Sequence, residues 1–181
     1  MPNERPAATW FSFLSDLDAQ LKEDVDVHCM GGFVVSQYYD CARETADLDV
    51  LGVVPVQATN QIEALAGKGS PLYRKYRVYL ESAGVTSYPD SYESRLIHIF
   101  PFWRRLKLWA LEAHDLALTK LERSIDRDLQ DVMYLARAGF LQRETLIERY
   151  RSEMRPYLSG PTPTWHDTTL EMWVNACWPT E

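Results

Sequence analysis

The stretch that decides the fold runs from residue 28 to residue 55 and reads HCMGGFVVSQYYDCARETADLDVLGVVP. One apolar run in it ends at the pair Gly31 and Gly32, and the next carries Asp47 and Asp49 on either side of a leucine. Because glycine has no Cβ atom, the backbone there can turn tightly and approach a ligand closely. Side chains two residues apart on a strand point to the same face, so the two carboxylates would lie together. The stretch is either ordinary turn chemistry between two strands or a place where a nucleotide and a metal meet.

The first third of the chain predicts alternating helices and strands around this stretch. Apolar residues at helical spacing predict an amphipathic helix before it, and a further helix after it that ends at Gly67. Apolar runs that stop at glycine or proline predict two buried strands with a short helix between them. In chain order the predicted elements are helix 8–23, strand 25–30, helix 33–39, strand 48–54 and helix 57–66.

The remainder predicts more strands and then helices. Residues 95–100 alternate as a strand does, and WRRLKLWAL (103–111) predicts an antiparallel partner for it. Beyond Glu112 the apolar stripes are helical, a last long helix ends at Pro156, and 160–181 predicts a loop followed by a short apolar segment. The fold class is therefore α+β, with one mixed sheet packed by helices and a helical C-terminal part. We expect residues 1–112 to form the α/β core and 113–181 to pack on it as one compact unit.

The composition is that of an ordinary folded protein, with 46% hydrophobic and 25% charged side chains among 181 residues. Three irregularly spaced cysteines predict neither a disulfide framework nor zinc, and favour a reducing cytoplasm. No apolar run spans a bilayer and no secretory signal is evident, so we expect a cytoplasmic protein without a membrane partner. The net charge of −7 argues against broad nonspecific binding to nucleic acid, but leaves a local basic patch open.

The acid pair favours a metal site. Asp47 and Asp49 on one face repel each other unless a cation lies between them. Mg²⁺, or Mn²⁺ in its place, binds through such carboxylates together with substrate phosphates. A lone glycine pair is often only a turn, and a lone acid pair is often a solvated edge, but the apolar residues 50–54 favour a central strand here. A phosphate-binding loop beside a carboxylate pair is the arrangement that two-metal phosphoryl or nucleotidyl transfer uses.

GGFVVSQYYDCARETADLDVL (31–51) resembles the signature of the polymerase-β-like nucleotidyltransferase superfamily, in which a strand ending in two small residues precedes a strand with Asp-x-Asp. It is most similar to the small bacterial branch related to the AbiEii-type abortive-infection toxins. In that branch an Arg and a Ser or Thr precede the acid pair, as Arg43 and Thr45 do here. The resemblance implies that Asp47 and Asp49 are catalytic and hold the metal, and that Gly31, Gly32, Arg43 and Thr45 bind the nucleotide.

HDLALTKLERSIDRDLQDVMYLARAG (114–139) is similar to a second segment of that branch. The residues that match it are Asp115, Leu116, Lys120, Leu121, Arg127, Asp128 and Asp131. The resemblance implies that Lys120 and Arg127 neutralise the triphosphate, because an ammonium and a guanidinium both suit phosphate oxygens. Asp128 and Asp131 could pair with those cations. The open alternative is a helix start with surface ion pairs, in which Asp126 or Asp128 is the cap and Asp131 lies in the first turn.

One expected part of the site is missing from the predicted strands. Active members of the superfamily usually carry a third carboxylate on a neighbouring strand, but the strand expected there, 106–110, holds a lysine and no acid. Glu93 and Glu112 flank the predicted hairpin as the only substitutes nearby. Among the aromatic residues, Tyr38, Tyr39 and Trp109 could stack on a base, although a place in the core is the favoured alternative for them.

Two hypotheses of different class follow. The first is a Mg²⁺-dependent nucleotidyltransferase that moves a nucleoside monophosphate from an NTP to a hydroxyl of an RNA such as tRNA, or of a protein. By resemblance it would belong to a toxin–antitoxin system with a cognate toxin or antitoxin as partner. The second, motivated by the missing third acid, is a catalytically inactive nucleotidyltransferase fold that acts as a binding module or antitoxin. A plain structural domain is the remaining alternative.

Overall fold

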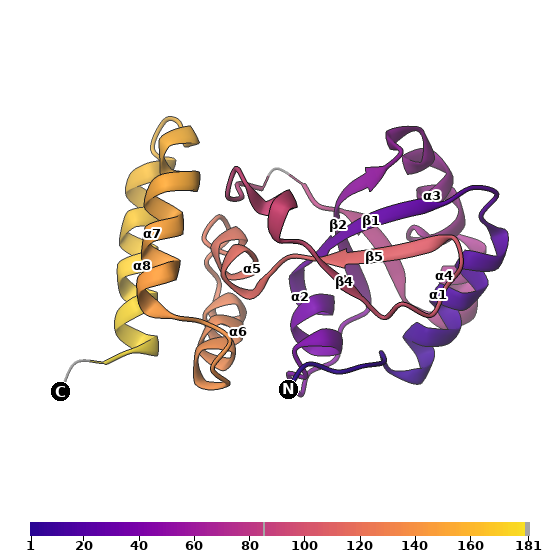
Figure 1. Ribbon diagram of the computed structural model, residues 1–181, viewed down its shortest axis with the longest axis horizontal. Coiled ribbons are helices and arrows are strands. Elements are labelled where there is room, and N and C mark those ends of the chain that lie inside the picture. The colour runs from indigo at the N-terminus through magenta and orange to yellow at the C-terminus, as the bar shows by residue number, and fades with distance from the viewer. Residues whose placement is uncertain (85, 180–181) are drawn as a thin grey trace. The chain divides into compact units, whose positions relative to one another are not determined.

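A mixed five-stranded sheet organises the first of two units in the computed structural model, which describes residues 1–84 and 86–179 (Figure 1). The strand order is β3-β2-β1-β5-β4. Strand β1 pairs antiparallel with β2 and parallel with β5, while β3 runs parallel to β2 and β4 antiparallel to β5. The strands are β1 (Val25–Met30), β2 (Asp47–Val54), β3 (Tyr79–Ser82), β4 (Ile97–Ile99) and β5 (Leu106–Ala110).

One face of this sheet forms the core of the first unit. Alternate residues of β1, β2 and β5 are almost fully buried on it, as period-two patterning requires. Helices α1, α3 and α4 pack against one another and supply a further part of the core, with Phe13, Leu14 and Leu17 of α1 completely buried. The helical elements of the unit are α1 (Ala8–Gln20), α2 (Gly31–Phe33), the π-helix η1 (Val34–Tyr38), the 3₁₀ turn η2 (Val56–Ala58), α3 (Thr59–Ala66) and α4 (Pro71–Tyr76).

The second unit is helical and takes in residues 86–95 as well as 112–179. Arg95 explains why the earlier segment belongs to it, because its guanidinium lies 2.8 Å from a carboxylate oxygen of Asp115 and 2.6 Å from one of Glu153. None of the helices described in 1–84 and 86–179 is long and apolar enough to cross a membrane. The elements are η3 (Tyr92–Arg95), α5 (Ala113–Thr119), α6 (Asp126–Arg137), α7 (Arg143–Arg149), the π-helix η4 (Tyr150–Met154), the 3₁₀ turn η5 (Arg155–Tyr157) and α8 (Thr162–Cys177).

The structure confirms the α+β class and most of the predicted elements, including β1 at its predicted bounds. The prediction for the tail is wrong, because most of 160–179 forms helix α8 while 180–181 lie outside the described residues. Pro161 and Pro163 lie at the N-cap and in the first turn of α8, where a helix needs no backbone N–H donor. Helix α4 and strand β3 were not predicted.

Candidate metal centre

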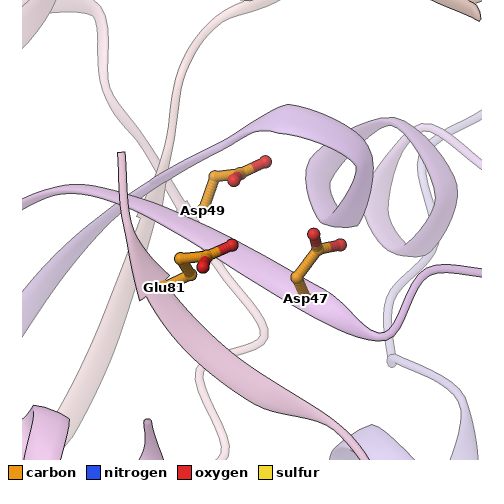
Figure 2. A group of neighbouring side chains, drawn as sticks. All are labelled: Asp47, Asp49 and Glu81. Carbon is orange, nitrogen blue, oxygen red and sulfur yellow. The ribbon is translucent and has the colours of Figure 1, made fainter. Parts of the chain in front are cut away.

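Strands β2 and β3 bring three carboxylates to one face of the sheet. Asp49 pairs in register with Glu81. Two residues earlier on each strand, Asp47 pairs with Tyr79. Paired residues of neighbouring strands point to the same face, and so do residues two apart on one strand. Figure 2 shows the side chains of Asp47, Asp49 and Glu81 on the same side of the two strands. One carboxylate oxygen of each lies within 4.8 Å of the other two.

This set of donors suits a divalent cation. Like charges so close together are unfavourable without a cation, and carboxylate oxygens are the ligands that Mg²⁺ and Mn²⁺ prefer. Asp47 and Asp49 are half-buried and Glu81 is exposed, so a cation there would keep one open side for substrate or water. The three residues can therefore hold one metal ion and share a second with substrate phosphates.

Gly31 has no room for a side chain, because Asp49 lies directly beside it. Its backbone has a φ of +71°, and a Cβ atom at this position would collide with Oδ2 of Asp49. Helical structure begins at Gly31 itself, two residues earlier than predicted, so the chain turns directly from β1 into α2. The first N–H groups of a helix lack an acceptor within the helix and favour anions, which suits a phosphate. A glycine is required here for its backbone conformation and for the space beside the carboxylate.

Gly32, Arg43 and Thr45 form the next layer around the acids. A Cβ atom on Gly32 would collide with the guanidinium of Arg43 and lie 3.3 Å from Oγ1 of Thr45. The same Thr45 hydroxyl donates a hydrogen bond of 2.7 Å to Oδ1 of Asp47. The structure thus brings together six of the eight predicted site residues, namely Gly31, Gly32, Arg43, Thr45, Asp47 and Asp49.

The third carboxylate corrects the sequence prediction. The sequence predicts this acid on 106–110, with Glu93 and Glu112 as substitutes, but the residue beside the acid pair is Glu81 on β3. Glu93 and Glu112 both belong to the second unit, where Glu112 pairs with His114 and Arg149. The only sequence signal was the alternation in VYLES (78–82), which is too short to separate a strand from a loop.

Tyr79 lies beside the acids on the same face, in register with Asp47. Burial and then the negative charge of Glu81 raise the pKa of its hydroxyl above the ordinary value of 10. Tyr79 therefore stays neutral at physiological pH and adds no charge to the cluster.

Lys120 and Arg127, the remaining two predicted site residues, lie in the second unit. They do not share a continuous helix, because α5 ends at Thr119 and α6 begins at Asp126. Lys120 is buried, and its Nζ lies 2.8 Å from Oδ2 of Asp131 and 3.4 Å from Oδ1 of Asp128. Arg127 is exposed. The ammonium group of Lys120 is thus neutralised within its own unit by Asp128 and Asp131, the two acids expected to pair with the cations.

The chain was compared with protein families, curated proteins and solved structures. Residues 11–167 match the model of a family described as "Nucleotidyltransferase of unknown function (DUF6036)". Neither the curated proteins nor the solved structures contain a significant match to this chain.

Proposed function

This chain belongs to the DUF6036 family of nucleotidyltransferases, and we propose that it transfers a nucleoside monophosphate from an NTP to a hydroxyl group, using a divalent metal held by Asp47, Asp49 and Glu81. The observation that carries the proposal is the cluster of three carboxylates on β2 and β3. The collision that a side chain at Gly31 would make with Asp49 supports it, because the turn before the helix and the metal ligand are fitted to each other.

The proposed reaction is an in-line displacement at the α-phosphorus of the NTP. An acceptor hydroxyl attacks that phosphorus, its bond to the bridging oxygen of the β-phosphate breaks, and pyrophosphate leaves. Bound Mg²⁺ or Mn²⁺ would neutralise the charge that develops on the phosphate oxygens. Glu81, the exposed member of the cluster, is placed to accept the proton of the attacking hydroxyl at its carboxylate. Gly31 and Gly32 would let the triphosphate approach the first turn of α2.

The finer assignments rest on the sequence resemblance. By this resemblance the protein is related to the AbiEii-type toxins, and its acceptor is a hydroxyl of tRNA or of a protein. Its partner would be a cognate toxin or antitoxin. A triphosphate-binding role for Lys120 and Arg127 belongs with these assignments. Arg127 is exposed and therefore suited to such a role, whereas Lys120 would have to exchange its two buried carboxylate partners for phosphate.

The alternative of a catalytically inactive module was motivated by the missing third acid. Glu81 supplies a third carboxylate from β3, a strand neighbouring the acid pair, instead of from 106–110 where that acid was expected. No specific observation in the structure favours the inactive alternative over the enzyme.

A transfer assay tests the proposal. The purified protein is incubated with each of the four α-labelled NTPs, with Mg²⁺ or Mn²⁺, and with total tRNA or cell lysate as acceptor. We expect label on a macromolecule with the wild type and none with the Asp47→Asn/Asp49→Asn double variant. Glu81→Gln should reduce the rate by at least about 100-fold, as expected for loss of both a metal ligand and a general base.

Asp26→Asn is the matched control for these variants. Asp26 is a half-buried carboxylate on the same sheet, and it pairs with Lys107 at 4.0 Å. It lies outside the cluster of three acids, so its neutralisation should leave transfer unchanged. Equal activity in the wild type and the double variant, or no label with any NTP and acceptor, would contradict the proposed activity.

A further inference from the structure

A pair of stacked rings lies on the face of the sheet that carries the acids. The rings of Trp109 on β5 and His98 on β4 stack with centroids 4.8 Å apart and planes 26° apart. The neighbours of Trp109 along β5, Leu108 and Ala110, are completely buried on the opposite face. Trp109 itself is half-buried and His98 is exposed, so these rings are not part of the hydrophobic core.

The register of the strands places the rings relative to the acids. Met30 pairs with Asp49, which pairs with Glu81, so one row across the sheet contains two of the three acids, and Asp47 lies two residues further along β2, on the side away from the rings. Two residues earlier on β1, His28 pairs with Trp109, which pairs with His98. The two rows lie on one face and roughly 7 Å apart along β1, from the rise per residue of a strand. The rings extend away from Glu81, since β5 and β4 lie across β1 from β2 and β3.

We propose that Trp109, supported by His98, is the platform on which the nucleobase of the NTP stacks. This inference rests on the proposed function and names the part of the substrate that the ring row, Trp109 and His98, would bind. Because β5 lies two strands from β2, Trp109 is also displaced by about 10 Å across the sheet from Asp49. The α-phosphate and the ribose, which lie between the metal and the nucleobase, have to span this separation. Aromatic and imidazole rings are the side chains on which bases stack.

The platform also has a consequence for base preference. Stacking does not distinguish bases by their hydrogen-bonding edges, because every base has a π-face. We therefore expect all four NTPs to bind, with the larger purines favoured over the pyrimidines.

Calorimetric titration of the full chain with Mg²⁺-ATP and, separately, with Mg²⁺-tripolyphosphate tests this inference. Tripolyphosphate has the phosphate chain but no base. We expect Trp109→Leu to weaken ATP binding at least about fivefold and to leave tripolyphosphate binding unchanged. Trp109→Phe, which keeps a ring, should retain most of the ATP affinity. If Trp109→Leu does not fold, His98→Ala should show the same selective loss to a smaller extent.

Phe102→Leu is the matched control. Phe102 is an exposed ring in the connection between β4 and β5 that contacts Phe11 and Trp103 but lies outside the ring row. Its replacement should alter neither titration. An equal loss for both ligands, or no loss for either, would overturn the platform while leaving the proposed function standing. If the wild type binds neither ligand, the proposed function itself fails, and the platform fails with it.

Discussion

Gly31 connects the turn after β1 to the carboxylate of Asp49. In Gly31→Ala the new methyl group has to displace Oδ2 of Asp49, and the residue has to keep a φ of +71°. A positive φ alone costs roughly 1–2 kcal/mol for an alanine. We predict that Gly31→Ala loses Mn²⁺ binding and transfer activity in addition to this loss of stability. Metal titration and the unfolding free energy, measured on the same sample, separate the two effects.

Gly69→Ala is the control for the backbone contribution. Gly69 has a φ of +87°, but a Cβ atom there would meet nothing within 4 Å. It should lose only the roughly 1–2 kcal/mol of the positive φ, less than Gly31→Ala, while keeping metal binding. Full metal affinity in Gly31→Ala would show that the acid cluster does not depend on this glycine.

Thr45 fixes the orientation of one metal ligand. Its hydroxyl donates to Oδ1 of Asp47 at 2.7 Å, and groups that orient a ligand typically contribute 10–100-fold in affinity or activity. We predict a loss of roughly that size for Thr45→Val, and near-complete retention for Thr45→Ser, which keeps the donor. The Mn²⁺ dissociation constants of the three proteins are the measurement. A valine variant that binds as tightly as the wild type would remove Thr45 from the site.

At the level of elements, the connection between α5 and α6 is held by a buried ion cluster. Lys120 at the end of α5 contacts Asp128 and Asp131 of α6, and Arg123 contacts Asp128 at 2.7 Å. Burial raises the pKa of Asp128, but the hydrogen bond from Arg123 and the charge of Lys120 outweigh it and hold this pKa below its ordinary value. Asp128 is therefore charged at neutral pH and depends on the cations beside it.

Lys120→Met should destabilise the protein by roughly 3–5 kcal/mol, the usual cost of removing one partner from a buried ion pair. Arg127→Met, an exposed neighbour on α6, should cost less than about 0.5 kcal/mol. Denaturant titrations give both values. The reverse result, an unchanged stability with weakened ATP binding in Lys120→Met, would assign this lysine to the nucleotide instead of to the fold.

Glu112 gives the second unit a dependence on pH. Burial raises its pKa, but His114 and Arg149 outweigh this effect and lower it to about 2 from the ordinary 4.5. Because the pKa is lower in the folded state, the stabilisation is fully present above pH 4.5 and is lost as the pH falls toward about 2. We predict that the difference in unfolding free energy between the wild type and Glu112→Gln shrinks over this range.

The control for this pH dependence is Glu144→Gln, which alters a carboxylate that is 82% exposed and 3.6 Å from Arg143. Its stability should follow that of the wild type at every pH. A constant difference between Glu112→Gln and the wild type from pH 6 to pH 2 would show that Glu112 has no depressed pKa.

At the level of the whole molecule, the sequence predicts those parts in which one local signal agrees with the packing. Strand β1 and the acid pair of β2 were predictable because apolar runs bounded by glycine and proline lie on the buried face. Glu81 was not, because β3 has only four residues and is defined by its pairing with β2. Helix α8 was missed because its prolines resemble loop punctuation until the helix start is known.

The division into units also depends on contacts that lie far apart in the sequence. Residues 86–95 precede β4 and β5 in the chain, yet they group with the C-terminal helices through Arg95 and its two acidic partners. Lys120 shows the same limit, since the sequence resemblance assigned it to the triphosphate together with Arg127, and only the turn between α5 and α6 pairs it with Asp131.

The central claim is that Asp47, Asp49 and Glu81 together bind the catalytic metal, and a Mn²⁺ titration followed by electron paramagnetic resonance tests it most directly. Free Mn²⁺ has a sharp signal that is lost on binding, so the titration reports affinity and stoichiometry without requiring the acceptor. We predict saturable binding by the wild type that ATP strengthens, weaker binding by Glu81→Gln, loss in Asp47→Asn/Asp49→Asn, and no change in Asp26→Asn. Equal binding by the wild type and the double aspartate variant would contradict the account.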